Sequence, residues 1–342
     1  MMAGRGSSAA AGGPARHIPV MLSEALAALD PKDGDIVVDG TFGAGGYSEA
    51  ILNRADCKVI AIDRDPEAFR LSGRLAEKYP GRLLAVLGRY SEMDAIAASE
   101  GFTAVDAVTL DLGVSSMQLD RPERGFSFMQ EGPLDMRMGE GGPSAGDIVN
   151  ARSEQELAEI IGKLGEERRA RAIAKAIVAR RAERPIATTL ELADLVAKVL
   201  GRKRDDTKHP ATRTFQALRL FLNEELDELA KGLAAAEGLL RARGRLAIVT
   251  FHSLEDRIAK RFLASRSAPP PRASRHLPEA AGKIFTPSFQ LLNRRPLEPN
   301  KGEIARNPRA RSARLRAAVR TAAPAHPLDL SALGVPRLGL AV

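Results

Sequence analysis

The chain has 342 residues and a net charge of +8, from 51 lysines and arginines against 43 aspartates and glutamates. Its single cysteine, Cys57, excludes an intramolecular disulfide, and no Cys/His cluster has zinc spacing, so we expect no metal. No apolar run approaches the roughly 20 residues of a membrane helix, and residues 1–16 lack the apolar core of a signal peptide. We therefore expect a cytoplasmic protein with a disordered N-terminal tail and no membrane partner.

Buried strands alternate with helices over the first third of the chain. Short apolar runs at 35–39, 58–63, 83–87 and 105–111 have the composition of parallel strands that are buried on both faces. The segments between them have helical patterns. This alternation predicts an α/β fold with a doubly wound, Rossmann-like sheet.

A long helical region separates these strands from the next convincing one, at 245–251. Within it, Ser153 with Glu156 and Thr188 with Glu191 have the spacing of capping boxes. Apolar residues on one face predict a single long helix over 212–240.

These patterns divide the chain into a sheet domain interrupted by a helical insert. The predicted ranges are 1–16 for the disordered tail, 17–138 and 216–320 for the sheet domain, 139–215 for the insert and 321–342 for a C-terminal tail.

Acidic residues end three of the four early strands, at Asp39, Asp63 and Asp111. Ligands of a doubly wound sheet bind at the carboxyl ends of its strands, so the three carboxylates are expected in one crevice. A glycine-rich turn, 40–46, follows the first strand and lets the backbone pass close to a ligand. Asp63 follows Gly43 by 20 residues, where such folds place a ribose-binding acid.

The glycine turn favours S-adenosylmethionine over a dinucleotide. Counting from Gly43, Ser48 stands where the third glycine of a dinucleotide motif is required. Asp39, directly before the turn, would repel a pyrophosphate but suits the ammonium and sulfonium charges of S-adenosylmethionine. Glycines occur in any tight strand-to-helix turn and do not by themselves indicate a cofactor. The assignment of S-adenosylmethionine therefore depends largely on the acids that end the following strands, Asp63 and Asp111.

Several longer motifs occur in order between about residues 17 and 320. They are Val37–Gly46, Leu110–Ser116 with Gln118–Asp120, Arg124–Phe128, Gly132–Met138, Gly165–Arg168, His209–Ala217, Phe251–Arg257 and Asn307–Ser312. Together they resemble the 16S ribosomal RNA cytosine N4-methyltransferase family, also known as the MraW family. The resemblance implies a Rossmann-like methyltransferase sheet with an inserted helical substrate-recognition domain. It also implies N4-methylcytidine in the decoding region of 16S ribosomal RNA as the product.

The resemblance also assigns cofactor positions. With Asp39 and Gly43 from the turn, the expected S-adenosylmethionine site consists of Asp39, Gly43, Gly45, Gly46, Tyr47, Asp63, Tyr90, Asp111 and Gln118. Tyr47 stands where many relatives have histidine, and Tyr90 where many have phenylalanine. Both keep a flat ring, so Tyr90 can still pack on adenine, whereas a contact that needs an imidazole is in doubt at Tyr47.

The expected chemistry needs an acceptor for the target amine, because the lone pair of a cytosine amine is delocalised into the ring. Many amino-methyltransferases have an Asp/Asn-Pro-Pro-aromatic tetrapeptide after the fourth strand, but this chain has Asp-Leu-Gly-Val at 111–114. Asp111, Ser115 and His252 are the candidate catalytic residues. Each has a structural alternative: Asp111 can orient the cofactor or base, Ser115 can cap a helix, and His252 can form a structural hydrogen bond.

Basic residues gather in three segments, 163–184, 202–213 and 306–320. A solvated helix face explains any one such segment, but three segments around one site favour RNA. The arginines expected to contact RNA are Arg213, Arg309, Arg311 and Arg314. The expected partner is 16S ribosomal RNA in the small subunit or a late precursor, and both a monomer and a homodimer remain open.

Three other functions remain open. A methyltransferase acting on DNA or a small molecule would use the same fold, although the helical insert and basic segments argue against the small molecule. A ribosome-assembly factor with a vestigial cofactor site is disfavoured by the intact Asp39, Asp63 and Asp111. A nicotinamide-dependent dehydrogenase is disfavoured by the glycine turn.

Overall fold

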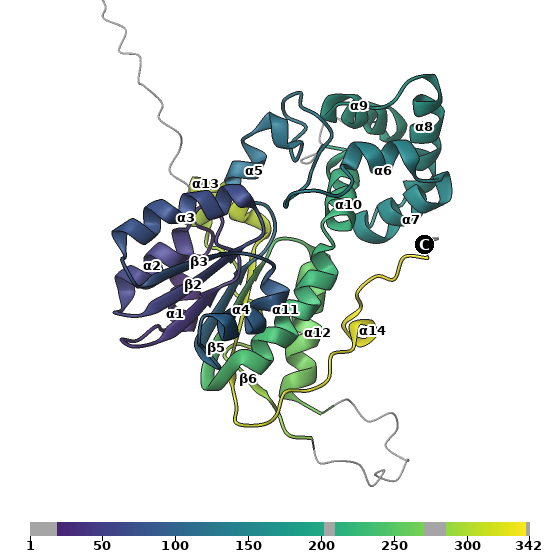
Figure 1. Cartoon of the computed structure of the whole chain (residues 1–342). Helices are drawn as coiled ribbons and strands as arrows, with labels where there is room; N and C mark the ends of the chain where they lie inside the picture. The colour runs from purple at the N-terminus through teal and green to yellow at the C-terminus, as the bar shows by residue number, and fades with distance from the viewer. Residues whose placement is uncertain (1–18, 202–208, 270–284, 340–342) are drawn as a thin grey trace, which may run out of the picture.

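A computed structural model describes residues 19–201, 209–269 and 285–339. Its centre is a seven-stranded sheet with the order β3-β2-β1-β4-β5-β7-β6 (Figure 1). The strands are β1 (Ile36–Asp39), β2 (Lys58–Asp63), β3 (Leu83–Leu87), β4 (Val105–Asp111), β5 (Leu240–Thr250), β6 (Phe289–Leu291) and β7 (Arg314–Arg320). The pairs among β1 to β5 are parallel, whereas β7 runs antiparallel to β5 and β6. The predicted doubly wound α/β sheet is confirmed.

Strand β7 lies outside the predicted elements because it occupies an arginine-rich segment. Leu315 and Ala317 are buried, while Arg314 and Arg316 alternate with them and pair with Asp256 at 2.9 and 2.8 Å. The two arginines therefore share one carboxylate within the fold. Their alternation with apolar residues is a strand pattern that a count of charges conceals.

Helices cover both faces of the sheet (Figure 1). One face carries α1 (Leu22–Leu29), α2 (Gly46–Arg54) and α3 (Pro66–Lys78), and the other carries α4 (Met93–Ser99), α11 (Glu225–Leu239) and α12 (Ser253–Ser267). Apolar strand residues alternate between the two cores: Val37 and Val59 face one, and Val38 and Ile60 face the other. The central strands are thus buried on both faces, as their apolar runs predict.

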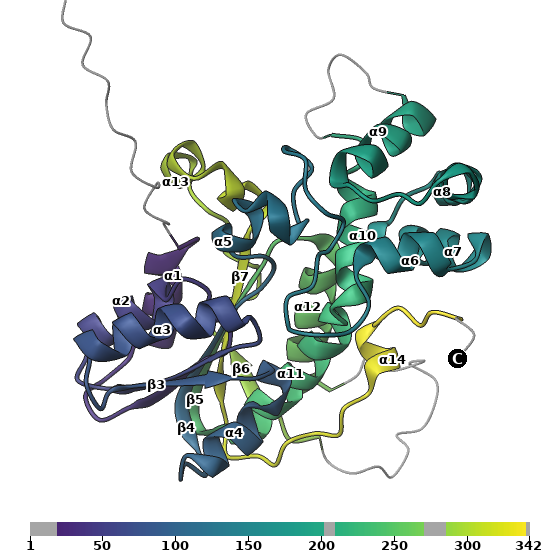
Figure 2. The same ribbon diagram turned by 45° about the horizontal axis from the view of Figure 1, so that its top comes forward.

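The insert is a group of helices beside the sheet (Figure 2). It contains α6 (Ala145–Ala151), α7 (Glu154–Gly165), α8 (Ala170–Glu183), α9 (Thr189–Leu200) and α10 (Thr212–Leu222). The capping box of Ser153 and Glu156 is confirmed in both directions. At Thr188 only one half forms, because the Glu191 carboxylate accepts from the amide of Ala187 instead, at 2.9 Å.

The prediction of one helix over 212–240 is wrong, because the chain turns between α10 and α11. Glu224 has a φ of 53°, outside the helical range. The buried amide of Asn223 holds this turn: it donates to the carbonyl of Met136 and accepts from the N–H of Met138, both at 2.9 Å. The predicted insert boundary at 215/216 accordingly falls inside α10.

The C-terminal segment packs back onto the molecule. Arg266 of α12 donates to the carbonyl of Pro327 at 3.0 Å, and Lys163 of α7 donates to the carbonyl of Arg337 at 2.6 Å. Between these contacts lies the short helix α14 (Leu330–Leu333), so residues 321–339 run from the sheet domain to the insert (Figure 2). The predicted N-terminal tail and residues 202–208 of the second basic segment lie outside the described residues.

The described residues contain neither a membrane-spanning helix nor a metal-binding cluster. No helix among them is long and apolar enough to cross a membrane. They also contain no group of three or more His, Cys, Asp or Glu side chains arranged to hold a metal ion.

Candidate functional site

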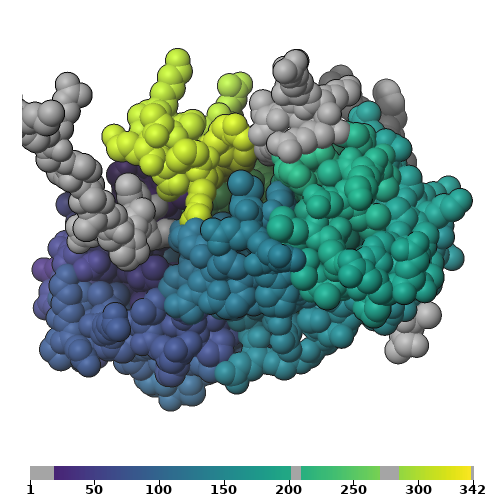
Figure 3. All heavy atoms as spheres, turned by 90° about the horizontal axis from the view of Figure 1, so that it is seen from above, coloured from purple at the N-terminus to yellow at the C-terminus, as the bar shows by residue number. Residues whose placement is uncertain are grey.

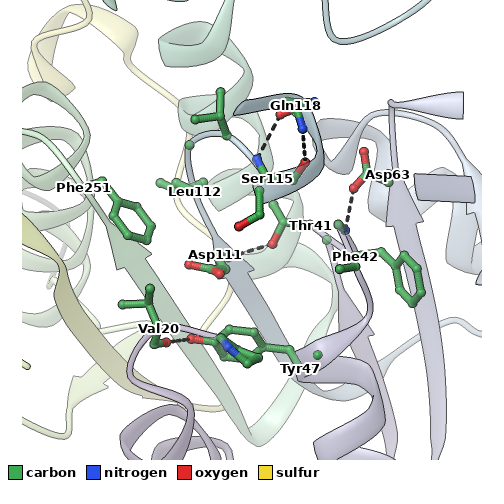
Figure 4. A pocket seen from close by; sticks show the side chains of 18 of the residues that line it. Val20, Thr41, Phe42, Tyr47, Asp63, Asp111, Leu112, Ser115, Gln118 and Phe251 are labelled. Atoms are coloured by element: carbon green, nitrogen blue, oxygen red, sulfur yellow. Dashed lines mark hydrogen bonds between the residues drawn. The ribbon is translucent and has the colours of Figure 1, made fainter. Parts of the chain in front are cut away.

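A cavity of about 440 Å³ lies at the carboxyl ends of β1, β2 and β4 (Figure 4). In the sheet, β2 and β3 lie on one side of β1, and β4 and β5 lie on the other. The cavity therefore lies next to the point, between β1 and β4, where the strand order reverses. Most of the expected cofactor residues line it: Gly43, Gly46, Tyr47, Asp63, Tyr90, Asp111 and Gln118. Asp39, at the end of β1, and Gly45, which lies within the turn against Phe42, do not line it.

Asp39 supports the glycine turn from below. Its carboxylate accepts hydrogen bonds from the hydroxyl of Ser48 at 2.7 Å and the amide of Thr41 at 3.2 Å. Burial raises the pKa of Asp39 to about 6, although both hydrogen bonds oppose this rise. Asp39 therefore shapes the turn rather than facing a ligand.

Asp63 joins the end of β2 to the same turn. One carboxylate oxygen accepts from the amide of Gly43 at 2.7 Å, and the other accepts from the amide of Asp65 at 2.9 Å. Burial raises the pKa of Asp63 to about 6. Each carboxylate oxygen has a second lone pair, so Asp63 can still accept from a ligand hydroxyl in the cavity.

Gly45 requires glycine for two independent reasons. Its φ is +82°, a conformation that other residues rarely adopt, and a Cβ there would lie 2.7 Å from the ring of Phe42. Gly34 has a nearly equal φ of +84° but no heavy atom within 4 Å of an added Cβ. A substitution at Gly34 would therefore test backbone strain alone, whereas one at Gly45 would add a steric overlap.

We expect Gly34→Ala to cost about 1–2 kcal/mol of folding free energy, because only the left-handed backbone is penalised. Gly45→Ala should cost more, about 3 kcal/mol, because the Phe42 ring must also move. Urea unfolding measures both, and calorimetry with S-adenosylmethionine should show weakened binding for Gly45→Ala alone. Equal stability and affinity in the two variants would contradict this account of the turn.

Asp111 ends β4 at the cavity with an unused acceptor. Its Oδ1 atom is buried and has no hydrogen-bond partner among the described residues, while its amide donates to the hydroxyl of Thr41 at 2.7 Å. Burial, followed by the nearby Asp39 and Glu255, raises the pKa of Asp111 well above its usual range. An unpartnered buried carboxylate oxygen is costly, so this atom is suited to a donor supplied by a ligand.

Ser115 and Gln118 form the capping box of α5 (Ser116–Leu119) on the cavity wall. The Gln118 side chain accepts from the amide of Ser115 at 2.9 Å and donates to Asp65 at 2.8 Å. The hydroxyl of Ser115 accepts from the amide of Gln118 at 3.3 Å. Ser115 thus has the helix-capping position that was its structural alternative.

Two tyrosines line the cavity in different ways. The hydroxyl of Tyr47 donates to the carbonyl of Val20, so the ring closes the cavity from the side of the N-terminal segment (Figure 4). Tyr90 packs directly over Gly232 of α11, where a Cβ would overlap its ring. At Tyr47 the phenol therefore has a partner in the chain itself.

Segments from both ends of the chain close the cavity together. Pro19 and Val20 line it from one side, and α13 (Lys301–Arg306) with the 3-10 turn 308–312 lies on another. The two segments are joined where the amide of Met21 donates to Glu303 at 2.6 Å. Arg309 pairs with Asp120 at 2.7 Å and also contacts Ser116 of α5. In Figure 3 the yellow-green segment that contains α13 lies beside the blue segment that follows β4.

Four further acids line the cavity that the sequence did not predict: Asp120, which pairs with Arg309, and Glu225, Glu228 and Glu255. Glu225 pairs with Arg219 at 2.8 Å, and Glu228 accepts from the amide of Ser91 at 3.0 Å. The three glutamates lie at the beginnings of α11 and α12, where their sequence pattern indicates only ordinary helix starts. With Asp63 and Asp111 they make a wall that suits a cationic ligand better than a pyrophosphate.

A second, wider cavity of about 1000 Å³ lies between the insert and the sheet domain. Motif residues that the first cavity leaves out line it, among them Glu166, His209, Arg213, His252 and Arg311. Phe251 lines both cavities, so it stands between them.

The structure places His252 on the second cavity and not on the first, where Asp111 lies. It caps α12, and its Nδ1 accepts from the amide of Glu255 at 3.4 Å. Its Nε2 lies 3.0 Å from the Glu255 carboxylate, but the angle is not that of a hydrogen bond. His252 and Asp111 therefore do not line the same cavity.

The four arginines expected to contact RNA also divide between the cavities. Arg309 lines the first, whereas Arg213, Arg311 and Arg314 line the second. Arg314 already pairs with Asp256, and Arg213 donates to the carbonyl of Glu166 at 3.1 Å. A phosphate would therefore compete with Asp256 at Arg314 and with the carbonyl of Glu166 at Arg213.

Known proteins are similar to this chain over most of its length. The sequence model of the MraW methylase family matches residues 14–321. A protein of Parvibaculum lavamentivorans named "Ribosomal RNA small subunit methyltransferase H" is 58% identical, over 93% of this chain and 93% of its own length. A protein of the same name from Xanthobacter autotrophicus is 57% identical, over 95% of this chain and 93% of its own length.

Proposed function

The chain belongs to the MraW methylase family, and from this premise we propose that it methylates the N4 amine of a cytidine in the decoding region of 16S ribosomal RNA, in the cytoplasm. The methyl donor is S-adenosylmethionine. The observation that carries the proposal is the unpartnered Oδ1 of Asp111, which lies in an acidic cavity beside a second cavity lined by arginines. The names of the similar proteins support a small-subunit RNA as the substrate.

The first cavity fits S-adenosylmethionine. Its acids, among them Asp63, Glu228 and Glu255, favour the two positive charges of that molecule, and Asp63 keeps lone pairs that can accept from a ribose hydroxyl. When bound, the cofactor supplies an electrophilic methyl group on a sulfonium centre. The N- and C-terminal segments over the cavity keep water from that group.

Asp111 orients the target amine. Its Oδ1 accepts one N–H of the amine, which lets the nitrogen pyramidalise and directs its lone pair toward the methyl group. Holding the two reacting atoms near contact distance provides most of the rate enhancement. Ser115 acts indirectly, since its capping box fixes the wall that Gln118 and Asp65 share.

The second cavity receives the RNA, and the insert recognises it. A paired amine is unreachable, so the target nucleotide must be unpaired or flipped out of its stack. The volume of this cavity is about 1000 Å³. This volume and the arginines that line the cavity suit a nucleotide with its phosphates.

A double variant, Arg213→Ala with Arg311→Ala, should weaken RNA binding and flatten its dependence on salt. Each phosphate contact that is lost lowers the slope of log affinity against log salt by about 0.7–0.9. Filter binding to small subunits over a range of salt concentrations measures the slope. The matched control, Arg70→Ala with Arg74→Ala, removes the same charge from exposed positions on α3 and should leave the slope unchanged. Equal slopes in the two double variants would contradict an RNA site in the second cavity.

The function is tested by mass spectrometry of ribosomal RNA nucleosides from a deletion strain with and without the restored gene. Restoration should return N4-methylcytidine to 16S RNA. Transfer assays on small subunits, a decoding-region oligonucleotide and duplex DNA then compare substrates, and we expect subunits to be methylated fastest. Methylation of the DNA alone would replace the proposal with the DNA alternative.

A further inference from the structure

Phe251 occupies the boundary between the two cavities. In the parallel pair β4/β5, Asp111 lies opposite Val249. Continuing that register by two residues brings Gly113 opposite Phe251, and a Cβ on Gly113 would lie 3.5 Å from the Phe251 ring. Gly113 has a φ of +100°, so glycine is favoured there and the space beside the ring stays open.

The backbone of Phe251 is fixed, and its ring packs against the edge of the core beneath α1, α2 and α3 without being fully buried. Its amide donates to Glu255 at 2.8 Å, and Glu255 belongs to the capping box that begins α12. The side chain is half-buried and lines both cavities. Figure 4 shows the ring at the end of β5, on the side of Asp111 and Leu112.

The other aromatic side chains that line the first cavity are already engaged. Phe42 is 4% exposed and lies against Gly45, Tyr47 is 4% exposed and bonded to Val20, and Tyr90 packs against α11. Among the described residues that line this cavity, only Phe251 also lines the second. The segment after β4, residues 111–114, contains no aromatic residue, so the neighbouring strand supplies a ring at this edge of the sheet.

We propose that Phe251 is the platform on which the target base stacks as it passes from the second cavity to Asp111. This inference rests on the proposed function. Unstacking a nucleotide from its RNA costs free energy, and stacking on an aromatic ring offsets that cost. A base held on Phe251 presents its edge to the side of the cavity where Oδ1 of Asp111 lacks a partner.

Fluorescence tests the contact directly, because the chain contains no tryptophan. Phe251→Trp introduces the only tryptophan of the chain, which can be excited at wavelengths that its three tyrosines do not absorb, and a decoding-region RNA oligonucleotide should quench its emission when a base stacks on it. The control is Phe102→Trp, since Phe102 precedes β4 at the opposite edge of the sheet and lines neither cavity. RNA that binds the Phe251→Trp protein, as filter binding shows, without quenching it would overturn the proposal.

Kinetics separate stacking from a structural role. Phe251→Leu should lower kcat/KM on small subunits by about 10- to 100-fold, the expected effect of removing one base–aromatic stack. Phe251→Tyr keeps the ring and should restore most of the activity, while S-adenosylmethionine affinity should be unchanged in both variants. An equal fall in cofactor affinity would make Phe251 a cofactor contact instead. If the wild-type protein methylates no subunits, the proposed function fails, but quenching of Phe251→Trp by RNA would still support the stacking site.

Discussion

Asp111→Ala should lower methyl transfer to small subunits by at least about 100-fold, a loss in the range seen when a preorganised hydrogen-bond partner of the reacting group is removed. The reason is the buried Oδ1, which has no partner among the described residues and lies in the first cavity, at the end of β4. The affinity for S-adenosylmethionine should fall much less, because Asp63 and the glycine turn remain. Single-turnover transfer measures the first quantity, and calorimetry measures the second.

The control for this experiment is Asp194→Ala, which removes an exposed acid from α9 in the insert, outside both cavities. It should leave transfer and cofactor affinity unchanged. If Asp111→Ala lost transfer and affinity to the same extent while remaining folded, Asp111 would be a cofactor residue only.

Asp63→Ala should weaken S-adenosylmethionine binding by about 10- to 100-fold, because a hydrogen bond from a ribose hydroxyl to a carboxylate is charge-assisted. The substitution also frees the amides of Gly43 and Asp65, which Asp63 accepts from in the structure. Calorimetry at constant pH measures the affinity, and a circular-dichroism melt checks that the variant is folded. An unchanged dissociation constant would remove Asp63 from the cofactor site.

The affinity for S-adenosylmethionine should rise as the pH increases from 5 to 7. Burial raises the pKa of both Asp39 and Asp63 to about 6, so these groups lose their protons in this range. Ionised Asp63 accepts a hydrogen bond from a ligand hydroxyl better than its protonated form does, and ionised Asp39 holds the glycine turn through Ser48 and Thr41. The α-amino group of the cofactor stays protonated below about pH 7.7, so its own titration does not produce the effect. Calorimetry across this range should show a flatter profile for Asp63→Asn.

The sheet and the position of the site could be predicted because their signals are local. A buried strand is a short apolar run, and an acid at its end is one residue further on, as at Asp39, Asp63 and Asp111. Parallel topology then brings the strand ends together without any knowledge of long-range contacts.

The cover of the cavity could not be predicted, because its contacts join residues far apart in the chain. The hydrogen bond from Met21 to Glu303 spans 282 residues, and the pairing of Arg309 with Asp120 spans 189. The break at Asn223 was missed for the same reason, since its partners are the backbone groups of Met136 and Met138. The sequence groups His252 with Asp111 because the ends of neighbouring strands are expected to open onto one cavity. In the structure, Phe251 lies between two cavities, and His252 lines only the second.

The hydrogen bond from Met21 to Glu303 determines when, during synthesis of the chain, the cavity can be closed. Strands β1 to β5 and helix α12 are complete when the ribosome has translated residue 267, but Glu303, Arg309 and β7 have not yet been synthesised. A nascent chain at that stage has its glycine turn and its acids, yet the cavity lacks one side of its cover. Full enclosure of the cavity therefore needs residues 303–320, and we expect a chain that stops at residue 267 to bind S-adenosylmethionine more weakly than the full chain does.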